Sequence, residues 1–338
     1  MSTAPIYLTE SDVQRLVSLN DAIAALETML QRQENGAAQA IPKSLATFGD
    51  RSSLHSLGSY SEGAKLGGFK TWVNTPSGAM AVYSLFDIDQ GRFLALIDAG
   101  LLGQLRTAGI SGLATDWLAD PHADELAIAG TGRQAQMQIA AVAAVRPIRR
   151  LRVFSPTAEN RQAFAAKMRR LFPFEVTEHD SPGDAFAGAP IVTLVTRART
   201  PFVTADMIGA DAHVNAVGAI LPANSEFDDG LFAKSASVTV DSVDGVRQNS
   251  REFIDHYGKD DAAWSGVRTL GSVIAQGRQP RGKGITLFKA MGMGLSDLAV
   301  AELVQRRAAE AGIGHPLPQE RPDALPRWEL CKSDKVGA

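Results

Sequence analysis

Three small residues, Gly130, Gly132 and Ala135, form a Gly-x-Gly-x-x-Ala pattern directly after the apolar run 126–129. The first glycine of such a pattern permits a tight turn, the second lets backbone approach a phosphate closely, and the alanine lets a helix pack on the preceding strand. A helix that begins here presents free N–H groups to an anion. The pattern predicts a pyrophosphate site for a dinucleotide, and a purely structural glycine turn is the alternative.

The residues that follow the next predicted strand bear on which dinucleotide is bound. Enzymes that prefer NADH usually have Asp or Glu there, which accepts a hydrogen bond from the ribose 2′-OH. This chain has Ser155 and Thr157, no carboxylate before Glu159, and Arg161 one helical turn further on. These donors suit a 2′-phosphate, so NADPH is favoured, with NADH as the alternative. A plain turn followed by a solvated arginine is the other interpretation.

Alternating strands and helices are expected to position this turn. Helices are predicted at the start of the chain, and short apolar runs between residues 44 and 98 predict strands and hairpins. A helix is predicted over 101–118, and the chain breaks at Asp120-Pro121. Strands and helices then alternate, which predicts parallel βαβ units. The expected strands are 125–129, 151–154, 175–178, 191–195, 213–217 and 237–240, and the expected helices 134–145 and 158–171. After about residue 245 helices are expected again, including an amphipathic one over 295–311.

Composition limits the function classes. The 338 residues are 45% hydrophobic with a formal net charge of −3, which gives no basic field for nucleic acid. The single cysteine, Cys331, allows no disulfide within the chain, and neither a secretory signal nor an apolar run of about 18 residues is present. A cytoplasmic protein with no nucleic-acid or membrane partner is expected. Asp241, Asp244 and His256 follow no ligand spacing, so no metal is predicted, and they are interpreted as surface residues; His55 and His213 are interpreted as ordinary strand residues.

Several segments, in the same order over most of the chain, resemble one protein family. They are the run 66–70, the block 85–108 that contains Arg106, the turn 130–135, the block 214–228, and the stretches 285–289 and 297–299. Together they resemble the ornithine cyclodeaminase/mu-crystallin family far more specifically than the glycine pattern alone.

The resemblance implies an α/β fold, in which a Rossmann-type, doubly wound parallel sheet over 119–290 binds NAD(P). It also implies an α+β substrate and dimerisation domain, built from 1–118 with 291–330, and a homodimer. Lys70 and Arg106 are similar to catalytic and substrate-binding positions, and Lys43 stands at a substrate position where the family usually has arginine. Cofactor positions implied in the same way, beside the glycine turn, are Arg106, Thr107, Arg133, Gln134, Ser155, Thr196 and Val217. Met291 begins a loop that either lines the nicotinamide pocket or merely precedes a helix.

Lys and Arg together suit a substrate carboxylate, because both form charge-assisted hydrogen bonds. The alternatives are a solubilising strand charge for Lys70 and a surface ion pair for Arg106.

One departure from the family pattern shapes the predicted function. Ile220 follows Gly218-Ala219 where cyclodeaminases of the family have a catalytic Asp. An aliphatic side chain cannot transfer protons, so cyclising deamination is disfavoured. Hydride transfer needs no such group. The chain is therefore predicted to reduce cyclic imino acids, Δ1-pyrroline-2-carboxylate to L-proline and Δ1-piperideine-2-carboxylate to L-pipecolate, with Lys70 available to polarise or protonate the imine.

Other functions remain open from the sequence. An amino-acid dehydrogenase or imine reductase that acts on an open-chain substrate (alanine or iminosuccinate) would need the same carboxylate-binding residues. Ornithine cyclodeaminase is a weaker alternative, and a binding protein that keeps NADP but lacks catalysis comes from a different class. Retention of Lys70 and Arg106 argues against the last.

Overall fold

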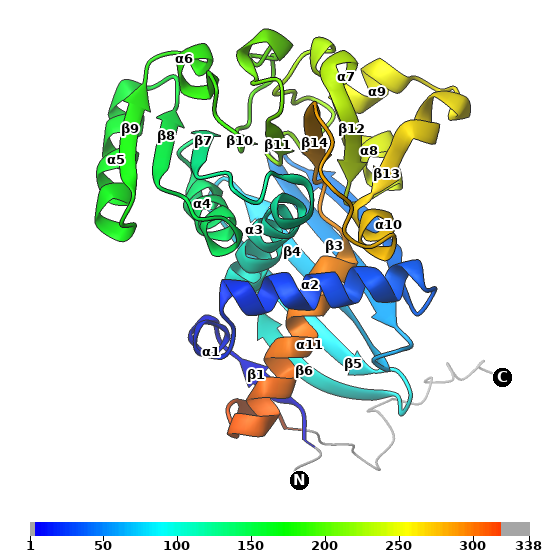
Figure 1. Ribbon diagram of the computed structural model, residues 1–338. Coiled ribbons are helices and arrows are strands. Elements are labelled where there is room, and N and C mark those ends of the chain that lie inside the picture. Colours follow the sequence, from blue (N-terminus) through cyan, green and yellow to red (C-terminus); the bar gives the residue numbers. More distant parts are fainter. Residues whose placement is uncertain (1–3, 319–338) are drawn as a thin grey trace, which may run out of the picture.

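The computed structural model describes residues 4–318, which form two β-sheets connected by a long central helix (Figure 1). The α/β fold with a doubly wound parallel sheet, expected from the sequence, is confirmed. Residues 319–330 of the expected second domain, and Cys331, lie outside the described residues.

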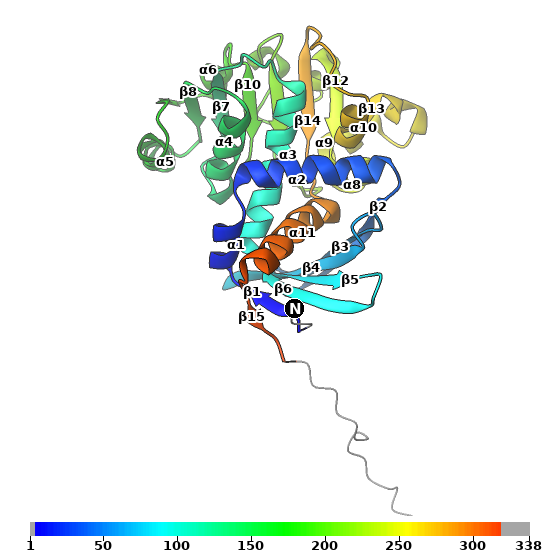
Figure 2. The ribbon, with the colours of Figure 1, turned by 60° about the horizontal axis from the view of Figure 1, so that its bottom comes forward.

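The seven-stranded sheet is mainly an antiparallel meander. Its strands are β2 (Ala38–Phe48), β3 (Ser52–Ser61), β4 (Leu66–Thr75), β5 (Gly78–Asp87) and β6 (Arg92–Asp98), joined at one edge by β1 (Ile6–Leu8) and β15 (His315–Pro316). Because β15 pairs with β1, the two ends of the described chain lie side by side (Figure 2). Helix α11 (Gly294–Ala311) packs on one face, against β2, β3 and β4.

Two helices at the start of the chain have well-defined N-termini. α1 (Glu10–Leu16) and α2 (Leu19–Glu34) each begin with a capping box, formed by Thr9 with Asp12 and by Ser18 with Asp21. Each box satisfies two backbone N–H groups that a helix start would otherwise leave unpaired. Both helices pack on α3 (Ala99–Leu118), and α2 also packs on α11.

The eight-stranded sheet is parallel throughout. In spatial order its strands are β13 (Val267–Thr269), β12 (Ser235–Val240), β14 (Ile285–Lys289), β11 (His213–Ala216), β10 (Ile191–Leu194), β7 (Glu125–Ala129), β8 (Arg150–Phe154) and β9 (Glu175–His179). The strand order reverses between β7 and β10, and ligands of such sheets bind at the carboxyl ends of the strands beside that reversal. The helices of this half are α4 (Arg133–Val145), α5 (Ala158–Leu171), α6 (Pro182–Phe186), α7 (Gly230–Lys234), α8 (Val243–Asn249), α9 (Arg251–Tyr257) and α10 (Leu270–Ala275), with 3-10 turns at Ala205–Met207 and Asp261–Gly266.

Most of the predicted strands and helices are confirmed, but two strands of the parallel sheet, β13 and β14, were not predicted. The strand at 125–129 and the helix at 158–171 have the expected bounds. The helices expected after about residue 245 are present as α8, α9, α10 and α11, but the strands β13 and β14 lie among them, and β14 lies inside the sheet between β11 and β12. The apolar run of β14 contains Thr286 and ends in Lys289, which disguises a strand whose five residues are all buried. The strand β2 also begins at Ala38, ahead of the region 44–98 assigned to strands.

Helix α3 connects the two halves. It packs on α4, β11 and β14 of one half and on α2, α11 and β5 of the other. Twelve of its twenty residues are buried, which fits a helix surrounded by protein on several sides. A side chain on α3 can therefore reach both halves, and Arg106 does so, because it pairs with Asp297 of α11 and lies against Gly292, which follows β14.

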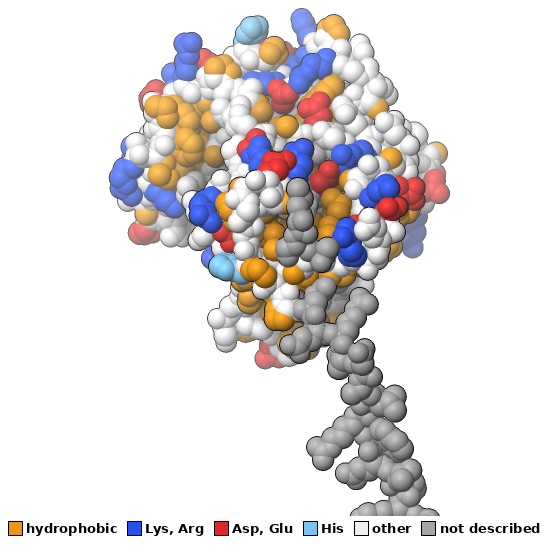
Figure 3. Space-filling model, turned by 90° about the horizontal axis from the view of Figure 1, so that it is seen from below, with side chains coloured by type: hydrophobic (Ala, Val, Ile, Leu, Met, Phe, Trp, Pro, Cys, Tyr) orange, Lys and Arg blue, Asp and Glu red, His pale blue; other side chains and the backbone are white. Residues whose placement is uncertain are grey.

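Within residues 4–318 no helix has both the length and the apolarity needed to cross a membrane. On the face seen from below, acidic and basic side chains are interspersed (Figure 3). This view agrees with the small net charge of the sequence.

Candidate active site

Lys70 and Asp297 form a buried ion pair between the antiparallel sheet and α11. The Nζ atom of Lys70, on β4, lies 2.8 Å from Oδ1 of Asp297, and the exposed fractions of the two residues are 5% and 0%. Asp297 occupies the first turn of α11, where the helix dipole favours a negative charge. The sequence prediction named Lys70 but gave Asp297 no role. The signals were its position near the start of an amphipathic helix and its place in the stretch 297–299 that resembles the family.

Arg106 brings a second cation to the same carboxylate. Its Nε atom lies 3.2 Å from Oδ1 of Asp297. Neither Arg106 Nε nor Asp297 Oδ2 has a hydrogen-bond partner within the described part of the chain, although both atoms are buried. Buried polar atoms nearly always form hydrogen bonds. The two atoms here form none within the described residues, so they mark a position that a polar ligand would fill.

Lys43, Trp72 and His55 extend the cluster along the sheet. The ammonium groups of Lys43 and Lys70 lie 5.5 Å and 5.1 Å from the centre of the Trp72 ring, within the range of cation–π attraction. His55 stacks on Trp72 with a centroid distance of 4.5 Å. Lys43 itself is exposed on β2. His55, expected to be an ordinary strand residue, thus borders the cluster.

The cluster carries more positive than negative charge. Lys43, Lys70 and Arg106 face the single carboxylate of Asp297. Burial, then the Arg106 charge, lower the pKa of Lys70, Asp297 opposes both effects, and the net result is a pKa of about 8. Burial and the Lys43 charge also lower the pKa of His55, so that its ring is neutral at neutral pH. An anionic ligand would balance the excess charge.

The glycine turn has the shape that the sequence predicts. Gly130 follows β7 with φ of 114°, and a Cβ atom there would lie 2.7 Å from the carbonyl oxygen of Val195. Gly132 is the N-cap of α4 and has no side-chain cap, and a Cβ atom there would meet no atom within 4 Å. Ala135 is fully buried against the sheet, while Arg133 is exposed and Gln134 partly buried. An open helix N-terminus beside the strand reversal fits a dinucleotide pyrophosphate.

The residues expected to select the dinucleotide lie together at the ends of β8 and β9. Thr157 is exposed at the start of α5, and Ser155 is buried. The Arg161 guanidinium turns inward, donates to the carbonyl oxygen of Ser155 and pairs with Asp180. Arg161 therefore shapes the Ser155–Thr157 turn in this structure, a role that the sequence did not suggest.

The remaining cofactor positions lie at the carboxyl edge of the parallel sheet. Thr196, Val217 and Met291 follow β10, β11 and β14, which are neighbouring parallel strands. Thr107 donates from its hydroxyl to the Gly103 carbonyl one turn earlier in α3.

Asp241 was interpreted as a surface residue, and this interpretation is wrong. It follows β12, it is 2% exposed, and its carboxylate accepts hydrogen bonds from the backbone N–H groups of Met291 and Gly292. Burial raises its pKa. Asp241 thus fixes the loop against which Arg106 packs. Within residues 4–318 no cluster of His, Cys, Asp or Glu has the arrangement of a metal site.

Arg106 places the ion cluster beside the carboxyl edge. A Cβ atom on Gly292, which follows β14 and Met291, would lie 2.6 Å from Nη1 of Arg106. The guanidinium therefore contacts the Met291–Gly292 loop at one end and Asp297 at the other. A small anion held by the cluster would lie next to whatever group binds at the ends of β7, β10, β11 and β14.

Comparisons with known proteins agree with this arrangement. A sequence model of the ornithine cyclodeaminase/mu-crystallin family matches residues 4–312. A Δ1-pyrroline-2-carboxylate reductase from Bacillus cereus is 27% identical over 321 residues, which cover 92% of this chain and 98% of that protein. A ketimine reductase mu-crystallin from Rattus norvegicus is 29% identical over 90% of this chain and 97% of its own. The structure of Thermococcus litoralis Δ1-pyrroline-2-carboxylate reductase in complex with NADH and L-proline superposes with a TM-score of 0.85, at 27% identity, over 92% of this chain and 100% of that one.

Proposed function

The chain belongs to the ornithine cyclodeaminase/mu-crystallin family, and we propose that it is an NAD(P)H-dependent reductase of cyclic imino acids. The proposed reactions are Δ1-pyrroline-2-carboxylate to L-proline and Δ1-piperideine-2-carboxylate to L-pipecolate. The observation that carries the proposal is the buried Lys70–Asp297–Arg106 cluster, which contacts the carboxyl edge of a dinucleotide-binding sheet through Gly292. The names of the relatives support the same reaction class.

Substrate binding follows from the excess positive charge. Arg106 and Lys70 would bind the substrate carboxylate, and Lys43 would add attraction from the exposed edge of the site. Arg106 Nε forms an ion pair with Asp297 but no hydrogen bond, so its N–H could donate to the substrate. Binding a carboxylate there leaves the imine of the same small molecule close to Lys70 and Asp297.

The protein has to orient the imine and supply a proton. When bound, the reduced nicotinamide supplies hydride to the imine carbon. Lys70 is mainly protonated at neutral pH, because its pKa is about 8, and can give a proton to the imine nitrogen. Ile220, 44% exposed after Gly218-Ala219, has no acid or base to offer, which disfavours deamination.

The cofactor would be NADPH, with NADH as the alternative. Gly130, Gly132 and the start of α4 would hold the pyrophosphate. The turn after β8 offers the hydroxyl groups of Ser155 and Thr157 and contains no acidic residue. Asp180 reaches the Arg161 guanidinium beside this turn, so a 2′-phosphate would have to share that cation.

We also propose the expected domain division, 1–118 with 291–330 and 119–290, a cytoplasmic location and a homodimer. Five large apolar side chains are exposed on the face of the antiparallel sheet opposite Lys70 and α11: Phe48, Leu54, Phe69, Met80 and Phe86. Contiguous apolar surface of this kind marks an interface between proteins, and a second copy of the chain would cover it.

The test is turnover of reduced cofactor with each cyclic imine, in wild type, Lys70→Ala and Lys65→Ala. Lys65 is an exposed lysine that pairs with Asp89 near the start of the same strand, so its loss controls for strand perturbation. We expect wild type and Lys65→Ala to turn over, faster with NADPH than with NADH, and Lys70→Ala to lose nearly all activity. Turnover of an open-chain oxo acid with ammonia, and of neither cyclic imine, would instead identify an amino-acid dehydrogenase. Nucleotide binding without any turnover would identify a non-catalytic binding protein.

A further inference from the structure

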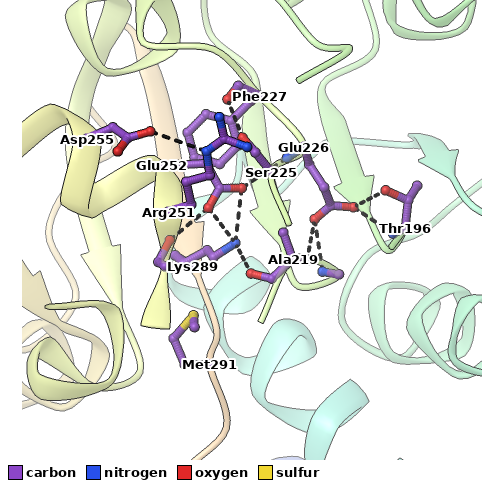
Figure 4. Close-up of polar contacts among 12 residues, drawn as sticks. Thr196, Ala219, Ser225, Glu226, Phe227, Arg251, Glu252, Asp255, Lys289 and Met291 are labelled. Carbon is purple, nitrogen blue, oxygen red and sulfur yellow. Dashed lines mark hydrogen bonds and ion pairs between the residues drawn. The ribbon is translucent and has the colours of Figure 1, made fainter. Parts of the chain in front are cut away.

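A fully buried carboxylate, Glu226, ties together two loops at the carboxyl edge of the parallel sheet. Its Oε1 atom accepts from the backbone N–H of Thr196 at 2.6 Å and from the Thr196 hydroxyl at 2.8 Å. Its Oε2 atom accepts from the N–H groups of Gly218 and Ala219, both at 3.0 Å (Figure 4). Four donors therefore converge on one side chain that is 0% exposed.

The two loops that Glu226 joins leave neighbouring strands. Thr196 follows β10 and Gly218 follows β11, and these strands are parallel. The loops also touch each other directly, because a Cβ atom on Gly218 would overlap the backbone nitrogen and oxygen of Thr196. The hydrogen bonds and the close approach together fix one loop against the other.

Glu226 is itself held by a second buried pair. Its backbone N–H donates to Glu252 at 3.0 Å. Lys289, at the end of β14, donates to the Ala219 carbonyl at 2.7 Å and pairs with Glu252 at 3.4 Å (Figure 4). Charges are buried only at considerable cost unless they are paired in this way, so the network is a defined and rigid arrangement.

The position of these loops determines which half of a dinucleotide they meet. In a sheet of this topology the pyrophosphate lies at the glycine turn, and the residue after the second strand meets the adenosine ribose. Here that second strand is β8, on one side of β7. The strands β10 and β11 lie on the other side of β7. The nicotinamide half would therefore lie over these strands, on the side of Arg106 and Lys70.

We propose that Glu226 is a positioning residue for the nicotinamide half of the cofactor. It holds the Thr196 and Gly218–Ala219 loops in the one arrangement that accepts the ring next to the ion cluster. The proposal rests on the proposed function, since it takes NAD(P)H as the ligand. Without the carboxylate, buried N–H groups of both loops would lack acceptors, and the loops would move to pair them.

Nucleotide fragments test this proposal directly. Glu226→Gln keeps the size of the side chain, but its NH2 group must face two donors on one loop or the other. The measurements are calorimetric affinities for NADPH and for 2′-phospho-ADP-ribose, which lacks the nicotinamide, together with NADH and ADP-ribose. We expect the variant to bind NADPH and NADH at least about tenfold more weakly, as the loss of charge-assisted hydrogen bonds implies, and to bind both fragments as wild type does. The KM for the reduced cofactor should rise with the dissociation constant.

Asp12→Asn is the matched control. Asp12 is also a buried, hydrogen-bonded carboxylate, but it caps α1 far from the edge of the sheet. We expect this variant to lose thermal stability with no change in nucleotide binding. If Glu226→Gln does not fold, Thr196→Val removes the hydroxyl, which donates to Glu226 and accepts from the Ala198 N–H, and should weaken NADPH binding about threefold without affecting fragment binding.

Each other outcome overturns the inference in a recognisable way. Equal weakening of dinucleotide and fragment means that Glu226 supports the whole nucleotide domain and not the nicotinamide half. Unchanged affinity for both means that it positions nothing. If wild-type protein binds neither NADPH nor NADH, the proposed function is refuted as well. If wild type turns over the cyclic imines and Glu226→Gln binds the cofactor as wild type does, only this inference is refuted.

Discussion

Replacing Asp297 by Asn should move the pH dependence of activity toward acid. The carboxylate lies 2.8 Å from Lys70 Nζ and keeps that amine protonated against burial, Arg106 and Lys43. An opposite charge at this separation changes a pKa by about 1–3, so its loss should bring the pKa of Lys70, about 8 in wild type, below about 7. The protonated fraction of Lys70 at pH 7 would then fall from about nine tenths to between about one half and one hundredth, and kcat/KM should fall with it, by about twofold to about a hundredfold.

The effect on stability should be smaller than the loss of a buried ion pair suggests. Breaking such a pair commonly costs about 3–5 kcal/mol, because a charge is left unpaired. Lys70 can avoid this cost by releasing its proton. With a pKa of about 8, releasing the proton costs only about 1.4 kcal/mol at pH 7. The loss of the Lys70–Asp297 interaction should therefore lower the free energy of unfolding by no more than about this amount.

The sign of the pH dependence follows from the same pKa. The folded-state pKa of Lys70 lies below its unfolded value of about 10.5, so the unfolded state binds more protons between the two values and stability rises with pH there. Above about pH 8 Lys70 is neutral in wild type too. The difference in unfolding free energy between wild type and Asp297→Asn should therefore narrow as the pH rises from about 7 to about 9.

The assay is the pH profile of kcat/KM for the cyclic imine, with thermal unfolding over the same range. The substrate's own ionisation is common to both proteins, so the difference between their basic limbs reports on Lys70. Asp21→Asn is the control, because Asp21 also lies in the first turn of a helix and pairs with Arg307 at 2.7 Å, but far from the cluster. A basic limb at the same pH in wild type and Asp297→Asn would refute the reasoning, as would an equal displacement in Asp21→Asn.

Two further predictions concern the Arg106 loop and the open face of the sheet. Gly292→Ala should raise the KM for the imino acid about tenfold, because the new methyl group would lie 2.6 Å from Arg106 Nη1. The control is Gly277→Ala, at a similar φ of 73° but with open space around it, which should only lower stability by about 1 kcal/mol. Equal kinetics in the two variants would contradict this prediction. Light scattering should give a dimer mass for wild type and a monomer mass for the double variant Leu54→Glu/Met80→Glu. The control variant Leu171→Glu, which changes a similarly exposed apolar residue on α5, should stay dimeric. A monomeric wild type would contradict the proposed dimer.

Local spacing was sufficient to predict the glycine turn and the strands and helices around it. The strand Glu125–Ala129, the glycine turn and the helices α4 and α5 were all recognisable, because each is specified by residues within a few positions of one another. The type of each residue carried the physical reason: Gly130 takes a positive φ, Gly132 leaves open space, and Ala135 lets α4 pack closely.

Strands that break the expected pattern could not be found in this way. The strand β2 is largely exposed and contains Pro42, so it lacks the alternation of a half-buried strand. The strand β14 is wholly buried yet ends in Lys289, whose charge is paired by Glu252 from a distant helix. In both cases tertiary contacts, and not local preference, stabilise the strand.

The sequence by itself determined which residue types were available for chemistry: Lys70 and Arg106 for an anion, a glycine turn for a pyrophosphate, and Ile220 where an acid would be needed for deamination. Only the tertiary structure decided how they work together. Asp297 reaches Lys70 across 227 positions of sequence, and Glu226, Asp241 and Arg161 proved to be buried supports of loops. Pairing of buried charges depends on strand register and helix packing, which no local pattern contains, because the cost of burial is offset only when distant parts of the chain meet.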